Sequence, residues 1–159
     1  MKVLVFSDSH GELSFMRDVI RQERPDQIFH LGDHDRDAED LAGEFPTIPI
    51  AAVQGNCDYY SDAPLTRVIT LRGSRFFLCH GHTFGVKTSY LRASYAALEQ
   101  KADFLLCGHT HEPYLEQNDR TFLTIMNPGS CGFSYPTYGR ILLEPGKLPE
   151  ATLIYPDMR

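Results

Sequence analysis

Three pairs of side chains that can bind metal recur along the chain, each with one residue between its members. The pairs are Asp8 and His10, His80 and His82, and His109 and His111. In extended backbone the side chains of residues i and i+2 point to the same side, so each pair can face one point. Asp33 adds a further carboxylate and Asn56 an amide oxygen. The sequence therefore predicts one polar site assembled from several separate stretches.

The donor atoms of this set are carboxylate oxygens, an amide oxygen and imidazole nitrogens, without thiolate. Such a mixed set suits divalent Mn, Fe, Zn, Ni or Co. It holds more ligands than one tetrahedral zinc ion needs. One carboxylate shared by two ions about 3.5 to 4 Å apart would use them all, and such an ion pair suits phosphoryl transfer. The donor set is therefore compatible with phosphoryl-transfer chemistry.

The ligand pairs follow short apolar runs. The runs are "KVLVF", "QIF", "IAAV", "RFFLC" and "DFLLC", and polar residues begin directly after each. Short runs rich in β-branched and aromatic residues, bounded by Gly and Asp, indicate buried strands. In open α/β sheets ligands bind at the carboxyl ends of the strands, so we expect the site at that edge.

Two helices are predicted between these strands, in residues 12–24 and 89–101, and Pro25 ends the first. Their expected buried stripes are Leu13, Met16 and Ile20 in the first helix and Leu91, Tyr95 and Leu98 in the second. The acidic run Asp35, Asp37, Glu39 and Asp40 is interpreted as the solvated first turn of a further helix. After residue 111 the pattern predicts strands joined mainly by turns.

Length and composition limit the class of protein. The 159 residues suit a single domain over residues 1–159. Hydrophobic residues make up 42% of the chain, and no apolar run approaches the roughly 18 residues of a membrane helix. The first apolar run is too short for a signal peptide, so we expect a cytoplasmic protein. A net charge of −6 disfavours a nucleic-acid partner. The four cysteines form no CxxC pair and are interpreted as small buried hydrophobes.

Five short motifs, in the order in which they occur, resemble the signature of the calcineurin-like metallophosphoesterases. They are "DSH" at 8–10, "GDHD" at 32–35, "GNCD" at 55–58, "HGH" at 80–82 and "GHTH" at 108–111. With the "NPGS" loop at 127–130, the chain is most similar to the small single-domain phosphodiesterase branch, which is related to a retromer subunit. The resemblance implies an α/β fold, a four-layer α/β/β/α sandwich with mixed sheets and the site at one end.

The resemblance also implies a role for each ligand. The first metal would be held by Asp8, His10 and His111, the second by Asn56, His80 and His109, and Asp33 would bridge the two. The implied cofactors are two divalent metal ions, manganese first, with nickel, iron, zinc or cobalt as alternatives. A hydroxide bridging both ions would attack the phosphorus of a small phosphodiester, so no Ser, Cys or His nucleophile is needed.

One position departs from the family pattern. Many members have "GNH", with the histidine near the leaving group, whereas this chain has Cys57, whose thiol is a weak proton donor. Asp58, Tyr59 and His82 are the remaining candidates for protonating the leaving group, and His82 could instead donate a hydrogen bond to the backbone. The expected catalytic set is Asp33, Asn56, Asp58 and His82.

Several neighbouring features have plainer interpretations. His30 is expected to be packed, the "NPGS" loop to shape a turn, and Arg36 to form a surface ion pair more readily than to clamp a phosphate. The alternative function is a scaffold or interaction protein of the same fold with little activity, but the complete ligand set favours the enzyme. A nuclease or a protein phosphatase is less favoured, and a homo-oligomer is left open.

Overall fold

Parallel strands form the centre of the first sheet of the computed structural model, which describes residues 1–156. In spatial order its strands are β10 (Glu150–Ile154), β9 (Tyr138–Leu142), β1 (Lys2–Phe6), β2 (Gln27–His30) and β3 (Ile50–Ala52). β1, β2 and β3 run parallel because a helix crosses over between each consecutive pair, whereas β9 is antiparallel to both β1 and β10. The first three apolar runs are therefore strands, as predicted.

The second sheet has the same mixed character. In spatial order its strands are β4 (Thr66–Leu71), β5 (Ser74–Cys79), β6 (Phe104–Leu106), β8 (Thr124–Asn127) and β7 (Tyr114–Gln117). β5, β6 and β8 run parallel, and the antiparallel strands β4 and β7 form its edges. The strands predicted after residue 111 are confirmed, whereas β4 was not predicted from the sequence. Its polar, half-exposed pattern lacks the continuous apolar run by which the buried strands were identified.

The two sheets pack face to face over one aromatic and aliphatic layer. Alternate residues of β1, Val3 and Val5, face this layer, while Leu4 and Phe6 face the helices on the other side. Within the layer the rings of Phe76 and Phe104 stack with centroids 4.7 Å apart. Because the central strands are covered on both faces, they are apolar at nearly every position.

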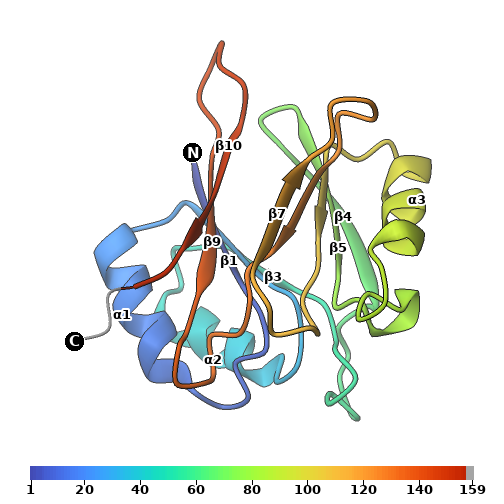
Figure 1. Ribbon diagram of the computed structural model, residues 1–159. Helices are drawn as coiled ribbons and strands as arrows, with labels where there is room; N and C mark the ends of the chain where they lie inside the picture. Colours follow the sequence, from blue (N-terminus) through green and yellow to red (C-terminus); the bar gives the residue numbers. More distant parts are fainter. Residues whose placement is uncertain (157–159) are drawn as a thin grey trace.

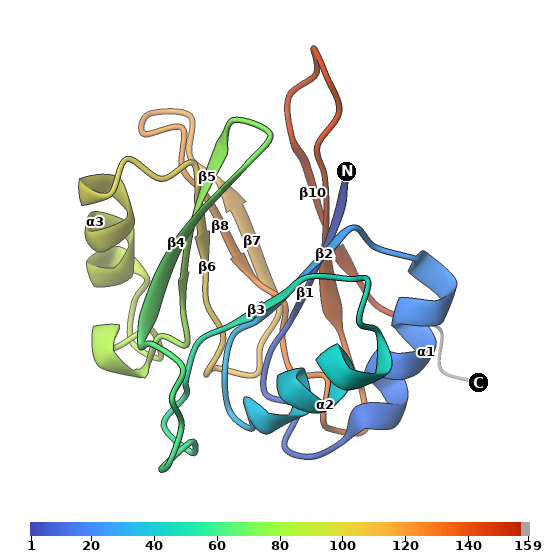
Figure 2. The ribbon, with the colours of Figure 1, turned by 180° about the vertical axis from the view of Figure 1, so that it is seen from behind.

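Helices cover the outer face of each sheet, which gives the four layers seen in Figures 1 and 2. α1 (Leu13–Glu23) and α2 (Arg36–Glu44) cover the first sheet. α3 (Leu91–Glu99) and the short 3-10 helix η1 (His82–Phe84) lie outside the second sheet. The predicted α/β/β/α sandwich with mixed sheets is confirmed.

The buried faces of the helices agree with the sequence in α1 and differ in α3. Met16 and Ile20 of α1 are buried, as its stripe predicts. In α3 the buried residues are Ala93 and Ala97, whereas Leu91 is 57% and Tyr95 60% exposed. The stripe predicted for α3 was therefore wrong for Leu91 and Tyr95, whereas Leu98 is half-buried and packs against the core, as predicted. Small side chains let this helix lie close to the large residues of the second sheet, and packing of that kind overrides the apolar periodicity.

The acidic run before and within α2 is also less solvated than predicted. Asp37, in the first turn, is only 1% exposed. Its Oδ2 accepts a hydrogen bond from the Gly11 N–H at 2.9 Å, and its Oδ1 lies 2.8 Å from Nδ1 of His34. Asp37 therefore links α2 to the loop that follows β1.

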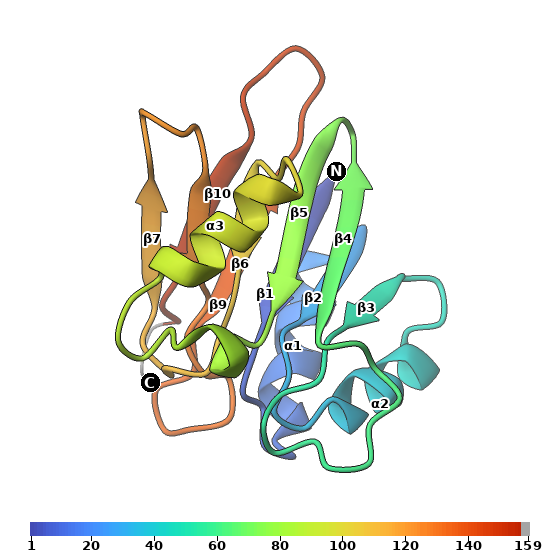
Figure 3. The same cartoon turned by 90° about the vertical axis from the view of Figure 1, so that its right-hand side faces the viewer.

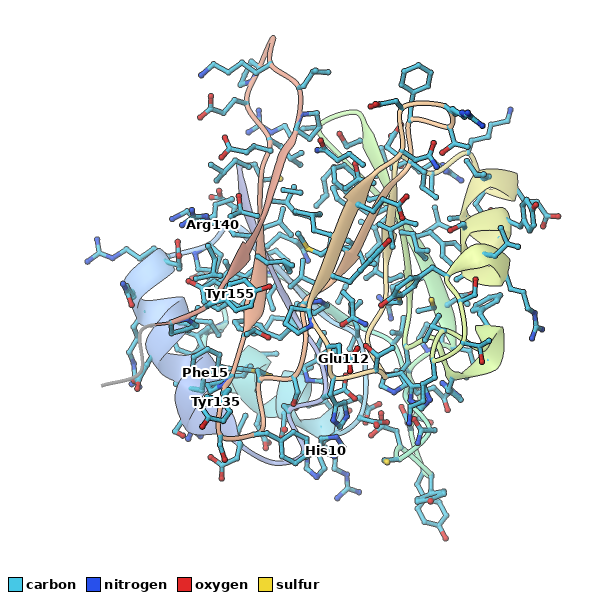
Figure 4. All side chains as sticks on the ribbon, in the orientation of Figure 1. His10, Phe15, Glu112, Tyr135, Arg140 and Tyr155 are labelled. Carbon is cyan, nitrogen blue, oxygen red and sulfur yellow. The ribbon has the colours of Figure 1, made fainter. Side chains whose placement is uncertain are left out.

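The parallel strands of both sheets end at the same edge of the molecule. In Figure 3 β5 runs down towards this edge, where the loops after β1 and β2 also lie. Figure 4 places His10 there, beneath both sheets. The edge agrees with the one predicted for the site. Within residues 1–156, no helix combines the length and the apolar composition needed to cross a membrane.

Candidate metal centre

Two groups of potential ligands meet at this edge and share one carboxylate. The first group contains Asp8, His10, Asp33 and His111, and the second contains Asp33, His80 and His109. Within each group, one ligand atom from every residue lies within 4.8 Å of all the others. Asp33 is the only residue common to both groups, which is the position predicted for a bridging ligand.

The backbone at these residues is left-handed and not extended. The φ angles are 55° at Asp8, 48° at His10, 56° at Asp33, 70° at His109 and 61° at His111. The extended backbone expected at these pairs was therefore wrong, because the side chains leave tight loops after the strands have ended, but Asp8 and His10 still lie in one ligand group as predicted. Accordingly, His109 and His111 belong to different groups, and His82 belongs to neither among the described residues. A left-handed L-residue costs about 1–2 kcal/mol, so other contacts must hold these loops.

Asp8 is held by donors from its own loop and from the second sheet. Its Oδ2 accepts hydrogen bonds from the Ser7 hydroxyl at 2.6 Å and from the His109 N–H at 3.1 Å. Its Oδ1 lies 3.0 Å from Nε2 of His111. The carboxylate is buried, and one oxygen is thereby left to face the ligand group.

Asp33 has comparable support. Its Oδ1 accepts the Cys57 N–H at 2.9 Å, and its Oδ2 lies 3.4 Å from Nε2 of His80. Burial alone would raise the pKa of Asp33, but the hydrogen bonds and charge of His80, together with Cys57, outweigh it and hold the pKa well below its usual range. The carboxylate is therefore ionised, as a ligand must be.

His80 shows most directly that the site suits a cation. Its Nδ1 lies 2.7 Å from the Leu31 carbonyl oxygen, which can only accept, so Nδ1 carries the proton and Nε2 faces the site. Three oxygens surround Nε2, namely Oδ1 of Asn56 at 3.0 Å, Oδ2 of Asp33 at 3.4 Å and Oδ1 of Asp8 at 3.8 Å. Burial would lower the pKa of His80, but Asp33 and Asp8 outweigh it and raise the pKa. Three oxygens that converge on one ring nitrogen favour positive charge at this point, so the donor set fits a divalent ion there.

His109 completes the second group from the loop after β6. Burial, followed by the charge of His80, lowers the pKa of His109, which keeps its imidazole neutral at neutral pH. A neutral imidazole is the form that binds metal. Asn56 is exposed, but its Oδ1 contact to His80 places it beside the same group.

Two glycines let the loops approach the carboxylates. A Cβ added at Gly55 would lie 2.2 Å from Oδ1 of Asp33. A Cβ added at Gly108 would lie 2.0 Å from the Ser7 hydroxyl oxygen and 2.7 Å from Oδ2 of Asp8. The glycines of "GNCD" and "GHTH" are therefore required by close packing against another loop.

Asp58 and His82, both predicted as catalytic, lie close to the ligand groups in different ways. The Asp58 carboxylate accepts four backbone N–H groups, from Asp33, His34, Asp35 and Gly55, at 2.7 to 3.2 Å. These bonds join the loop after β2 to the loop after β3. The His82 ring lies 5.4 Å from that of His80, and burial followed by the charge of His80 lowers its pKa. Its Nδ1 is buried without a hydrogen-bond partner in residues 1–156, so the bond to backbone considered for it is not formed.

The cysteine predictions hold for three residues of four. All four thiols are free, and Cys79, Cys107 and Cys131 are buried, but Cys57 is exposed. Burial and the charge of Asp33 raise the pKa of the Cys57 thiol. Tyr59 is exposed on the same loop.

Residues near the site that were interpreted as structural do support it. His30 is buried, and its Nε2 lies 2.9 Å from the Ser9 hydroxyl oxygen. In the "NPGS" loop, the Asn127 amide donates to the Gly108 carbonyl oxygen at 2.9 Å, and the Ser130 hydroxyl donates to the Asp8 carbonyl oxygen at 2.8 Å.

Sequence reasoning missed two residues at this edge. One is Asp37, which was hidden in an acidic run that looked solvated. The other is Phe133, whose ring lies against the imidazoles of His10 and His111. Phe133 stands outside every motif, and only its position three residues after the "NPGS" loop could have pointed to it.

Comparison with known proteins assigns the family. A sequence model of the calcineurin-like phosphoesterase superfamily domain matches residues 1–144. This chain belongs to that superfamily. Members bind divalent metals, and the ligand groups described above lie at the edge of the sheets where such a site is expected.

Individual relatives agree with this assignment. YsnB, a probable metallophosphoesterase of Bacillus subtilis, is 33% identical over 113 residues, which are 70% of this chain and 64% of that protein. The phosphodiesterase YfcE of Escherichia coli is 39% identical over 89 residues, which are 51% of this chain and 44% of that protein. The matched stretches thus span less than two thirds of either relative.

The fold recurs in solved structures. Wild-type Vps29 of Entamoeba histolytica, crystallised with zinc, superposes with a TM-score of 0.75 over 98% of this chain and 99% of that one, at 18% identity. At that identity the likeness shows the shared fold. The chain therefore has both the sequence pattern and the fold of the calcineurin-like phosphoesterase superfamily.

Proposed function

We propose that this phosphoesterase is a phosphodiesterase that works with two divalent metal ions. The observation that carries the proposal is the presence of Asp33 in both ligand groups. One carboxylate shared by two complete sets is the arrangement that a pair of ions requires. The relation to YfcE, which is named a phosphodiesterase, supports the choice of a diester.

The chain offers each ion a ligand set of its own. Asp8, His10 and His111 would hold the first ion, Asn56, His80 and His109 the second, and Asp33 both. The oxygen and imidazole donors suit manganese first, with nickel, iron, zinc or cobalt as alternatives. When bound, such ions supply Lewis-acid activation of water and neutralise charge on the phosphoryl group.

The protein's own groups orient and polarise this site. The low pKa of Asp33 keeps the shared carboxylate ionised, and the Leu31 contact fixes the tautomer of His80. His82 is the remaining candidate for moving a proton at the rim. Asp58 is better suited to positioning, because its oxygens already accept four N–H groups that bind the loops of Asp33 and Asn56 together.

A cavity beside the ligand groups gives room for one ester arm of a diester. Its volume is about 430 Å³, and its walls include Cys57, Asp58, Tyr59 and Arg36. We place the departing ester arm in this cavity, because Cys57 stands where the "GNH" motif of many family members has the histidine near the leaving group. This cavity has more acidic than basic side chains, which agrees with a small substrate in preference to nucleic acid.

The test combines metal content with turnover. We expect the purified protein to bind two equivalents of manganese and to hydrolyse bis(4-nitrophenyl) phosphate faster than 4-nitrophenyl phosphate. Asp18→Asn, a change on the exposed side of α1, serves as the matched control for carboxylate substitutions at the site. Binding of a single equivalent would contradict the dinuclear site, and a preference for the monoester would contradict the diester.

The second candidate is a scaffold of the same fold. The structural likeness to Vps29 favours it, because that likeness covers nearly the whole chain. The same assay separates the two candidates, since a scaffold would leave both substrates intact even when the ligand groups are saturated with metal.

A further inference from the structure

An exposed aromatic ring stands directly beside the first ligand group. The ring of Phe133 has its centroid 5.5 Å from that of His10 and 5.1 Å from that of His111. It is tilted against both, at 46° and 38°. Phe133 is nevertheless 56% exposed, so the imidazoles cover only part of the ring. A large apolar surface therefore remains open next to two of the potential metal ligands.

The loop that carries Phe133 is held firmly against the loop after β1. The Cys131 N–H donates to the Ser7 carbonyl oxygen at 3.1 Å, next to the bond from Ser130 to Asp8 described above. A Cβ added at Gly132 would lie 2.3 Å from the Ser9 carbonyl oxygen. The backbone immediately before Phe133 is thus fixed at van der Waals distance from the ligand loop, and the position of the ring follows from it.

The chemistry of a phenyl ring limits what it can do at this place. It can neither bind a divalent ion strongly nor donate a proton. It can pack against a flat group, and aromatic pairs gain about 0.5–1.5 kcal/mol beyond the area they bury. Such contacts tolerate many ring types, because every planar ring presents a π-face.

We propose that Phe133 determines specificity by stacking on a planar group carried by the ester arm that stays on phosphorus. The inference rests on the proposed function. The departing arm leaves with negative charge and needs polar surroundings, which the cavity at Cys57 offers and Phe133 does not. The preferred substrate class is therefore a phosphodiester whose retained arm bears an aryl or heteroaromatic ring.

Two substrates with a common leaving group isolate the retained arm. Bis(4-nitrophenyl) phosphate and methyl 4-nitrophenyl phosphate both release 4-nitrophenolate but retain an aryl and a methyl ester, respectively. In Phe133→Ala the ratio of their kcat/KM values should fall about three- to tenfold, as expected for one lost aromatic contact. Phe133→Tyr should restore it. The matched control is Phe122→Ala, which also removes an exposed ring. Phe122 belongs to the β7–β8 loop at the end of the molecule opposite the ligand groups, so this change should leave the ratio of kcat/KM values unchanged.

A binding measurement tests the same inference without turnover. Calorimetry on the manganese-loaded protein should show phenylphosphonate binding more tightly than methylphosphonate, with the difference reduced in Phe133→Ala. If the protein binds both phosphonates with this preference but hydrolyses neither diester, the proposed function fails and the stacking role stands.

Other outcomes overturn the stacking role. Equal losses on both substrates in Phe133→Ala would show that the ring only supports His10 and His111. Unchanged ratios would show that it contacts no substrate. An absence of phenyl preference in the native protein would have the same meaning. Metal content measured on each variant keeps a loss of ions from being mistaken for a loss of stacking.

Discussion

The two sheets contribute different chemistry to the same edge. Loops after β1 and β2 of the first sheet supply the carboxylates Asp8 and Asp33. The loop after β1 also supplies one imidazole, that of His10, whereas the loops after β5 and β6 of the second sheet supply only imidazoles, those of His80, His109 and His111. The acids are buried and held by several donors, whereas the buried ring nitrogen of His80 is held by one backbone contact. The backbone therefore makes two hydrogen bonds to the carboxylates, one to each, and one to the imidazole of His80.

The supporting contacts cross from one sheet to the other. Asp8 of the first sheet is held by the N–H of His109 from the second, and His80 of the second is oriented by the Leu31 carbonyl oxygen of the first. Each sheet therefore preorganises the ligands of the other. Neither sheet alone therefore carries all the ligands or all the contacts that orient them. Single substitutions at this edge should consequently differ in their effects on metal binding and turnover.

The largest effect on turnover is expected at Asp33, the residue shared by both ligand groups. Asp33→Asn should reduce turnover of bis(4-nitrophenyl) phosphate by about a thousandfold or more, because in the proposed site this carboxylate would be shared by both ions. Metal analysis should show that both equivalents are weakened. Two full equivalents with near-normal turnover would remove Asp33 from the bridging position.

Changes to single imidazoles should separate the two positions. Losing a group that merely orients a ligand costs about 10- to 100-fold in metal affinity, so losing a ligand should cost at least as much. His111→Ala should weaken the first ion and His109→Ala the second. X-ray absorption or anomalous scattering of the remaining metal would show two different geometries, and identical geometries would break the division.

The cavity at Cys57 predicts a dependence on the leaving group. General acid catalysis contributes about 10² to 10⁴ in rate. If the acid is weak, the rate should be lowered mainly for substrates with basic leaving groups. We expect a steep fall of log rate with leaving-group pKa in the native chain, and a rate gain in Cys57→His that is larger for alkyl than for nitrophenyl leaving groups. A native slope that is already flat would point to another donor, with His82 the next residue to change.

Asp58→Asn should mainly affect stability. The amide has one acceptor oxygen in place of two and directs an N–H₂ group at backbone donors, so we expect a loss of about 1–3 kcal/mol in the free energy of unfolding. Urea denaturation measures it, with the exposed neighbour Asp62→Asn as control. Unchanged stability combined with an altered leaving-group slope would instead assign Asp58 the role of proton donor.

The smallest effect is expected at the thiol itself. Cys57→Ser should keep most of its activity and its full metal content, because the cysteine is not proposed as a nucleophile. Steady-state kinetics with metal analysis checks this. A loss of kcat of about a thousandfold or more, with the fold intact, would mark a catalytic thiol.

The sequence was sufficient for the features that local patterns determine. Apolar runs such as "KVLVF" predicted the buried strands, and the motifs predicted which side chains would meet. The sequence was insufficient where tertiary packing decides which side chains are buried. Ala93 and Ala97 face the sheet because a helix must lie close to it, and Asp37 is buried because another loop donates to it. Phe133 reaches the site through contacts between loops more than a hundred residues apart in the chain.

The glycines before Asn56 and His109 limit how this site could be transplanted to another protein. Each glycine lies against a carboxylate from a different loop. If a replacement loop carried a larger residue at the glycine position, its side chain would overlap with Asp33 or Asp8. A graft of the seven ligand side chains alone onto a new sheet would therefore fail. The smallest unit that can be moved is the whole set of loops, glycines included, and natural exchange between relatives is subject to the same restriction.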